Sequence, residues 1–211
     1  VASDVSGTAE ARGNINFTNA GFRLPTTGAS NLTLNTQIAG KSSNVAPNAQ
    51  TMYLQAVKTS SDGTGACLPA FPDGTTLSIS MGSQCINPTT CSSQQVSMTY
   101  DSSPTASSTT VIASNPASPA TPVNYTPLNI TFKGSDAKAL ISINSADVGR
   151  MQLWAKYTMP VTGEVMQFVG SNQFVVRPFG FYVNPAGNPA AANAAGTKYK
   201  KAREAFSTTV T

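Results

Sequence analysis

The stretch ALISIN (Ala139–Asn144), followed by RMQLWAKYTM (Arg150–Met159) and NQFVVR (Asn172–Arg177), decides the fold class. Each segment is short, and each either alternates apolar and polar residues or is rich in β-branched and aromatic ones. Alternation with a period of two is typical of half-buried β-strands. The three segments therefore predict consecutive strands of a β domain.

Turn residues between these segments indicate how the strands are connected. Ser145-Ala-Asp-Val-Gly149 joins the first two, with an Asp that can cap backbone N–H groups and a Gly that tolerates positive φ. Immunoglobulin-like sandwiches have a comparable corner between strands E and F. Pro160–Gly163 then predicts a turn from strand F back toward strand G. The block is therefore typical of the closing strands of an immunoglobulin-like sandwich.

The rest of the chain continues the β pattern, and no window shows a sustained period of 3.6 residues with helix caps. Further strands are expected at Asn14–Phe17, Asn31–Ile38, Thr51–Val57, Thr75–Met81, Gln95–Tyr100 and Leu128–Phe132. Between the last two lies the stretch Asp101–Pro122, which is rich in Ser, Thr, Pro and Ala. It is predicted to be the least ordered part of the chain, either a long loop or a loose edge strand.

The predicted fold class is all-β: an elaborated immunoglobulin-like β-sandwich over residues 1–177, followed over 178–211 by a linker and the truncated start of a second β-sandwich domain. Pro185–Gly196 is a spacer of Pro, Ala, Gly and Asn between two strand-like runs, Phe179–Val183 and Ala205–Val210. So short a segment cannot build a core alone. Either run could instead add to the sheet edge of a neighbouring domain.

The cysteines predict one local disulfide. Cys85-Ile-Asn-Pro-Thr-Thr-Cys91 is a short loop with a central Pro and is well suited to a bridge between its two ends. Cys67 would then be unpaired or paired outside this fragment, because an odd count leaves one thiol over. A bridge from Cys67 to Cys85 or to Cys91 is the competing arrangement.

Composition argues against catalysis. Charged residues make up 10% of the chain, against about 25% in an average soluble domain, and there is no histidine. The absence of histidine excludes His general bases and most zinc sites. The 9 acidic residues nominate no facing pair for glycoside hydrolysis, and no Ser-x-x-Lys nucleophile motif lies on a helix. We therefore expect no enzyme, no catalytic residues, no metal ligands and no cofactor.

Two loops contain residues that could bind calcium. Ser60–Thr64 and Pro72–Gly74 each carry an Asp-Gly pair, and hard cations prefer carboxylate and carbonyl oxygens. Asp-Gly is also among the commonest turn dipeptides, so ordinary turns are the favoured interpretation.

The net charge of +4 is concentrated near the end of the sequence. Four basic residues less one acidic residue between Lys198 and Glu204 supply +3 of it. A nucleic-acid binder needs a denser basic face interleaved with stacking aromatics, so we expect a solvated strand edge or linker here and no nucleic-acid partner. No apolar run is long enough to span a membrane. The sequence begins at Val1 without a signal peptide, as an internal or mature fragment of a secreted protein would.

Trp154 is the one candidate ligand contact. It is the only tryptophan, and it falls on the opposite strand face from Met151, Leu153, Ala155 and Tyr157. Its companions on that face, Gln152 and Lys156, are polar, which is compatible with partial exposure and a role as a sugar-binding platform. Burial by a neighbouring loop, or by packing across the sandwich, is the favoured interpretation, and Lys156 could also cover the ring through a cation–π contact.

An ordered set of short motifs resembles the MshQ-like family of MSHA (mannose-sensitive haemagglutinin) pilus biogenesis proteins. The matching segments are Gly21–Arg23, Gln37–Ser42, Tyr53–Val57, Thr64–Cys67, Cys85–Cys91, Asp147–Gly149, Phe174–Pro178, Gly187–Ala191 and Lys200–Glu204. The resemblance covers nearly the whole chain. It implies a large, secreted, multi-domain Gram-negative surface protein of a type IV pilus setting, in some cases with a lectin-like domain ahead of this region. It supplies no catalytic residues.

We therefore expect a non-catalytic structural or adhesive module, extracellular and pilus-associated, whose partners are pilus or other cell-surface proteins and neighbouring domains of the same chain. The alternative is a lectin-like domain that binds glycans through Trp154.

Overall fold

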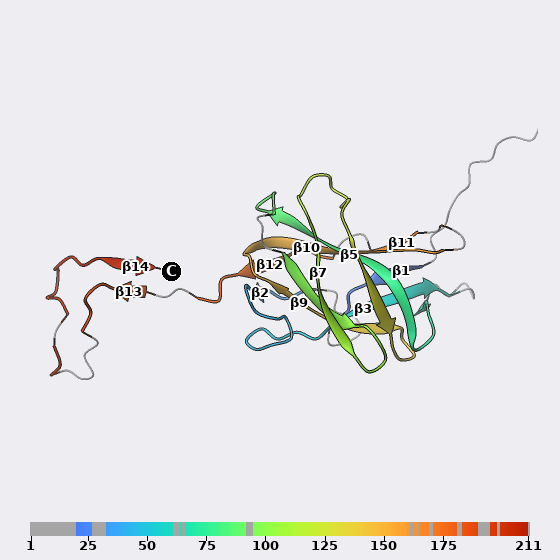
Figure 1. Ribbon diagram of the computed structural model, residues 1–211, viewed down its shortest axis with the longest axis horizontal. Coiled ribbons are helices and arrows are strands. Elements are labelled where there is room, and N and C mark those ends of the chain that lie inside the picture. Colours follow the sequence, from blue (N-terminus) through green and yellow to red (C-terminus); the bar gives the residue numbers. More distant parts are fainter. Residues whose placement is uncertain are drawn as a thin grey trace, which may run out of the picture.

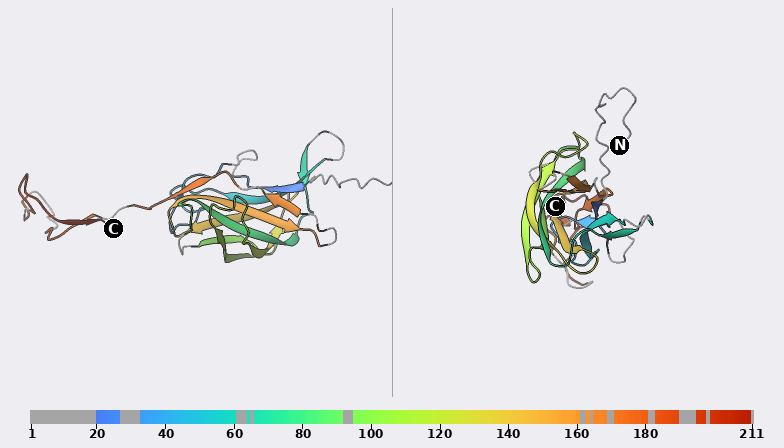
Figure 2. Two further views of the ribbon diagram at one scale, coloured as in Figure 1. Left: turned by 90° about the horizontal axis from the view of Figure 1, so that it is seen from above. Right: turned by 90° about the vertical axis from the view of Figure 1, so that its right-hand side faces the viewer.

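The computed structural model describes residues 20–26, 33–60, 64, 66–91, 95–160, 163, 165–168, 171–180, 183–189, 195–197 and 199–210. Every regular element in this part of the chain is a β-strand, as the alternating sequence patterns predicted. Figures 1 and 2 show a twisted two-layer sandwich with a separate hairpin near the C-terminus. The residues described include no helix whose length and apolar character would allow it to cross a membrane.

The first layer has the strand order A-B-E-D of an immunoglobulin domain. It consists of β1 (Ala20–Arg23), β3 (Met52–Thr59), β9 (Lys138–Ser145) and β6 (Val96–Asp101), each antiparallel to its neighbour. The short strand β4 (Cys67–Pro69) pairs with the end of β3. The sequence pattern correctly predicted β3, β6 and β9 to within two residues at each end.

The second layer has the order C-F-G. Strand C is the long β5 (Thr75–Asn87), strand F is β10 (Gly149–Thr158), and strand G is split into β11 (Val165–Phe168) and β12 (Phe174–Arg177). The two-residue β2 (Gln37–Ile38) lies parallel to β12 and closes that side of the sandwich.

A serine accounts for the split in strand G. Ser171 is buried between β11 and β12, where its Oγ accepts a hydrogen bond from the backbone N–H of Leu153 and its own N–H donates to the Leu153 carbonyl. Gln152 donates from its side chain to the Ser171 carbonyl. Because these bonds satisfy the edge of β10, the interruption leaves no buried backbone group of Leu153 unpaired.

The stretch Asp101–Pro122 is not the least ordered part of the chain, and that prediction was wrong. Its central part is β7 (Ser107–Asn115), which pairs antiparallel with β6 and then runs parallel to β5. β7 thus passes from the first layer to the second, and β8 (Thr126–Phe132) continues along the same edge of β5. These two strands join the open D and C edges, which is the elaboration on the basic sandwich.

Two other predicted strands, Asn14–Phe17 and Asn31–Ile38, are not confirmed over their full length. Asn14–Phe17 lies outside the described residues. Of Asn31–Ile38, the structure describes residues 33–38, and only Gln37–Ile38 forms a strand. Residues 33–36 pair with no strand; instead the buried side chain of Gln50 bonds the Asn35 N–H and the Thr33 carbonyl.

The core lies between the layers. Alternate residues of each strand enter it, so that Leu54, Met98 and Ile141 from the first layer meet Met81, Ile130 and Leu153 from the second. All six are at most 1% exposed. Phe132 packs between Phe22 and Phe71, with ring centroids 6.2 and 5.9 Å away. The expected inward face of β10 is confirmed: Met151, Leu153 and Ala155 are buried, and Tyr157 packs against the cluster.

The crossing from β9 to β10 uses Asp147 and Gly149. The Asp147 carboxylate accepts a hydrogen bond from the Val148 N–H at 2.8 Å. Gly149 has φ of 150°, and a Cβ at this position would lie 2.6 Å from the carbonyl oxygen of Asn87. Only glycine allows strand F to start this close to the end of strand C.

The segment after Arg177 contains a hairpin with its own two-stranded sheet. β13 (Val183–Pro185) pairs antiparallel with β14 (Thr208–Val210). Figure 1 shows this hairpin apart from the sandwich. The strand-like runs Phe179–Val183 and Ala205–Val210 were predicted a few residues too early: Phe179, Gly180 and residues 205–207 are not in strands.

Candidate functional site

The disulfide joins Cys85, near the end of β5, to Cys91 across the predicted loop. Of the arrangements that the sequence left open, the Cys85–Cys91 bridge is confirmed, and Cys67 is a free, exposed thiol on β4. The disulfide encloses a loop of few residues and therefore fixes the end of strand C locally, without tying distant parts of the fold together.

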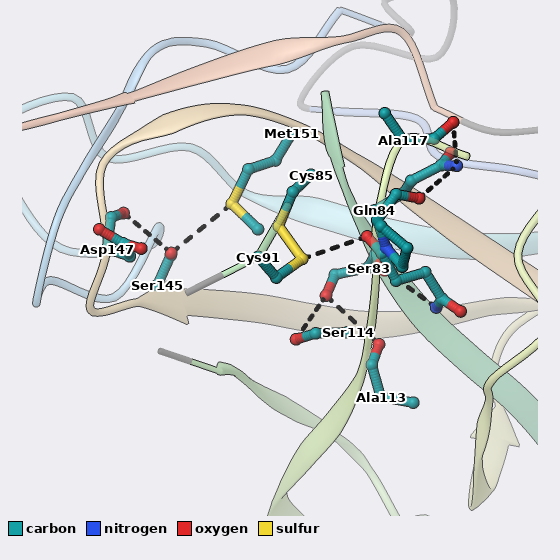
Figure 3. Close-up of a disulfide and its surroundings, with 12 residues drawn as sticks. Ser83, Gln84, Cys85, Cys91, Ala113, Ser114, Ala117, Ser145, Asp147 and Met151 are labelled. Atoms are coloured by element: carbon teal, nitrogen blue, oxygen red, sulfur yellow. Dashed lines mark hydrogen bonds between the residues drawn. A yellow bond between two sulfur atoms is a disulfide. The ribbon is translucent and has the colours of Figure 1, made fainter. Parts of the chain in front are cut away.

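The bridge packs against the crossing into strand F (Figure 3). Met151 follows that crossing, and its Sδ receives a hydrogen bond from Ser145 Oγ, which also donates to the Asp147 carbonyl. The space between the Cys85–Cys91 loop and residues 147–151 is about 10 Å³, which holds at most one water molecule. Among the residues described, the side chains of this loop and this crossing thus fill the space between them.

A second segment is held against the disulfide loop. The loop Pro116–Tyr125 follows β7, and its Ala117 N–H donates to the carbonyl of Thr89. The carbonyl oxygen of Asn115 lies 3.1 Å from Cys91 Sγ; this is a close contact, since a disulfide sulfur has no proton to donate. Figure 3 also shows Ser83 Oγ beside Ala113 and Ser114, where β7 joins β5.

Trp154 lies beneath this loop and is 5% exposed. Its cross-strand partner is Gly82, whose missing side chain leaves room for Asn124 and Tyr125: a Cβ there would lie 3.1 Å from the Asn124 carbonyl oxygen. The favoured interpretation, burial by a neighbouring loop, is therefore confirmed, and the alternative of an exposed aromatic platform is wrong. Trp154 does lie on the predicted strand face, but the loop covers that face, and Lys156 lies over the Tyr125 ring instead, 4.6 Å from its centroid.

Two buried amide side chains hold the loop. Gln84 accepts a hydrogen bond from Trp154 Nε1 at 3.0 Å and donates to the carbonyls of Pro116 and Pro119 at 3.1 and 3.0 Å. Asn115 donates to the carbonyls of Ser83 and Asn124 and accepts from the Asn124 N–H. We call these residues, Trp154, Gln84 and Asn115, the amide cluster. The prolines of this loop have no N–H with which to form a regular ladder, and buried side-chain donors satisfy the carbonyls of the loop instead.

The chemistry of this site is that of a scaffold. Its hydrogen bonds run between amides, an indole and backbone carbonyls, none of which ionises near neutral pH. The nearby titratable group with a shifted pKa is Tyr125, whose pKa burial raises above its ordinary value. What the arrangement can do is hold the exposed loop in one place on a rigid sheet, as scaffolds do for binding loops.

The other predicted sites lie elsewhere. Asp73 accepts a hydrogen bond from the Gly134 N–H, which supports the turn interpretation of Pro72–Gly74. Most of Ser60–Thr64 lies outside the described residues, as does Lys198. Among the residues described, no three His, Cys, Asp or Glu side chains are close enough together to hold a metal ion. Lys200 pairs with Glu204 at 2.8 Å within the exposed segment.

Sequence reasoning missed Gln84, Asn115 and Gly82. The pattern Ser78, Ser80, Gly82, Gln84 gives strand C one small, polar face, and such a face normally meets water. Asn115, directly before the Pro-rich stretch, was the one residue that could have indicated a buried amide. The sequence around it does not indicate that this stretch returns over strand C.

Comparison with known families gives one match. Residues 3–171 match the family described as a domain of unknown function (DUF6701), first Ig-like domain. No curated protein and no solved structure gives a significant match. The A-B-E-D and C-F-G layers agree with this description. The chain belongs to the DUF6701 family and carries its first immunoglobulin-like domain.

Proposed function

We propose that this chain is a non-catalytic architectural module, a spacer or stalk segment, of a secreted bacterial surface protein. The observation that carries the proposal is the placement of its first and last sandwich strands. β1 contacts β11, which pairs with the last residues of β10, whereas β12 pairs with the first residues of β10. Strand A and the end of strand G therefore lie at opposite poles of the sandwich (Figure 1).

This geometry suits a module that adds length. β10 has 10 residues, and at about 3.3 Å per residue the two poles are roughly 30 Å apart. Domains that pass the chain from pole to pole extend a protein when placed in series, whereas a chain that returns to its starting pole does not. We propose further that β13 and β14 belong to the start of a following β domain, because an isolated two-stranded hairpin is marginally stable.

Secretion is part of the proposal and rests on the disulfide. Disulfides form and persist in oxidising compartments and are rare in the cytosol. The Cys85–Cys91 bridge stiffens the end from which the chain passes to Pro178, and the amide cluster fixes a loop against the middle of β10. Both suit a rigid spacer.

The proposed function also includes association with pili, and this element rests on the resemblance to the MshQ-like family. Its partners would be pilus or other cell-surface proteins, together with neighbouring domains of the same chain. Glycan binding through Trp154 is not proposed, because that side chain is covered by the loop Pro116–Tyr125.

Shearing of surface appendages from cells that produce the protein tests this function. The sheared fraction is purified under non-oxidising conditions, and its proteins are identified by mass spectrometry. We expect the protein in that fraction, with Cys85 and Cys91 oxidised and pilins as the dominant companions. Recovery with the outer membrane and without pilins would remove the pilus association but leave the spacer. Recovery from the cytoplasm with both cysteines reduced would end the proposal.

A further inference from the structure

The loop Pro116–Tyr125 contains a feature that the spacer function does not use. Its sequence Pro116-Ala-Ser-Pro-Ala-Thr-Pro122 repeats the unit Ala-hydroxyl-Pro, with Ser118 and Thr121 in equivalent positions. Both residues are exposed, and the residues around them, Pro119 and Ala120, are exposed as well. Pro-interspersed Ser/Thr segments are the composition that carries O-linked sugars on secreted stalks.

The hydroxyls of this loop are available, unlike most of those in the adjoining strand. Within the described part of the chain, the Ser118 and Thr121 side chains have no hydrogen-bond partner. In β7 and its hairpin, by contrast, Thr109 bonds Thr99, Ser108 bonds Ser102 and Ser114 lies against Ser83. A hydroxyl already engaged within the fold is a poorer acceptor for a transferred group.

Backbone conformation separates this loop from the other exposed hydroxyl-rich segment, the tip of the β6–β7 hairpin. At that tip the N–H groups of Ser102 and Ser103 donate to the Ala106 carbonyl, and Ser103 Oγ caps the turn. The segment Ser118–Pro122 bends at residues 119–121, but among the backbone hydrogen bonds of the described residues none closes this bend. The backbone at Ser118 and Thr121 is therefore less constrained than at the hairpin tip, and both hydroxyls can reach a modifying enzyme.

The amide cluster explains how the loop can remain both exposed and fixed. Gln84 holds the Pro116 and Pro119 carbonyls from below, on either side of Ser118, and Asn115 holds Asn124. The inward side of the loop is thus committed to the sheet, and its hydroxyl side faces water. A bulky group on Ser118 or Thr121 would displace no core residue.

We propose that Ser118 and Thr121 are acceptors for O-linked glycosylation in the cell envelope. The inference rests on the proposed secretion of the protein, because the donor is then a sugar carried on a polyprenyl diphosphate. The side-chain oxygen attacks C1 of that sugar and forms the C1–O bond as the C1–O bond to the diphosphate breaks. The hydroxyl proton passes to a base of the transferase, and the polyprenyl diphosphate leaves. The attached sugars shield the loop and Val123, which is 69% exposed.

Peptide mapping of the protein purified from the surface of its own organism tests the proposal. Chymotrypsin cleaves after Tyr100 and Tyr125, and the peptide between them contains both acceptors and no internal aromatic residue. We expect a mass increase of one or more sugar units on this peptide, placed at Ser118 or Thr121 by electron-transfer fragmentation. The Ser118→Ala/Thr121→Ala variant should return the peptide to its unmodified mass. Thr105→Ala, at the hairpin tip of the same peptide, should leave the increase unchanged.

Three results would overturn the inference. One is an unmodified peptide from surface-exposed protein with the Cys85–Cys91 disulfide formed, which would leave the proposed function standing. Another is a sugar only on Asn124, which lies in the same peptide and is the first residue of an Asn-Tyr-Thr sequon in the protein. The last is cytoplasmic, reduced protein, which would end the proposed function as well. Glycosylated protein without accompanying pilins would support the inference and contradict only the pilus association.

Discussion

Replacing Gln84 by Met should destabilise the sandwich by about 3 kcal/mol. Met has a similar volume but cannot accept the Trp154 Nε1 proton or donate to the loop carbonyls. A buried donor left unpaired costs about 1–3 kcal/mol. The lost bonds to Pro116 and Pro119 add about 0.5 kcal/mol each, near the low end of the usual range, because both residues are exposed and water can replace Gln84.

Urea unfolding followed by fluorescence measures this change. Trp154 is the only tryptophan, so its emission reports directly on the amide cluster. With an m-value of about 2 kcal/mol/M, a loss of 3 kcal/mol lowers the unfolding midpoint by about 1.5 M. Acrylamide quenching of the native variant should increase, because the loop is no longer held over the ring.

The control is Gln95→Met, the same substitution at an exposed position, which should change stability by no more than about 0.5 kcal/mol. A double-mutant cycle with Trp154→Phe, followed by circular dichroism, should give a coupling energy of about 1–2 kcal/mol. If Gln84→Met destabilises no more than Gln95→Met does, the amide cluster does not hold the loop, and the reasoning is refuted.

Four further predictions follow from individual contacts. Cys85→Ser/Cys91→Ser should lower the unfolding free energy by about 2 kcal/mol and Tm by about 4–8 °C, because the disulfide closes a short loop with a sequence separation of 6. An unchanged Tm in calorimetry would contradict this. Gly149→Ala should cost about 2–4 kcal/mol because its Cβ meets the Asn87 carbonyl, whereas Gly180→Ala, with open space around it, should be nearly neutral in the same urea assay. Native protein should react with one equivalent of a maleimide at Cys67 without loss of stability, and the Cys67→Ser variant should not react. Labelling only in the presence of denaturant would show that the thiol is buried and would contradict this prediction. Burial raises the pKa of Tyr125, so the contribution of this side chain to stability is fully present below its unfolded-state pKa of about 10 and is lost as pH rises through its folded-state pKa. Tyr125→Phe should therefore lose less stability than wild type above pH 10. Parallel stability curves against pH for the two proteins would contradict this.

Local patterns predicted the parts of the fold that local chemistry determines. β9 and β10 have clear period-two alternation, and the Asp147–Gly149 corner between them needs residue types with a direct conformational meaning. The Cys85–Cys91 bridge was equally local, because only a short loop separates its ends.

Tertiary contacts determine the parts that were predicted wrongly. β7 is a run of Ser and Thr with one fully buried apolar residue, Ile112, and it becomes a strand because β6 and β5 offer it free edges. Trp154 is buried by a loop whose contacts reach it through Gln84, 70 residues away in sequence. Burial by a neighbouring loop was the favoured interpretation, but no property of the segment Leu153–Tyr157 indicates which loop provides the cover.

The most direct test of the spacer function is replacement of the sandwich by an unrelated immunoglobulin-like domain of similar length between its poles, joined at residues 20 and 177. The protein, with whatever sequence flanks it in the cell, is then measured for its amount in the sheared surface fraction and for attachment of cells to their substratum. An architectural spacer predicts that both quantities remain within about twofold of wild type, a difference worth only about 0.4 kcal/mol. Loss of attachment with an unchanged amount at the surface would contradict the account, because the sandwich would then bind a ligand itself.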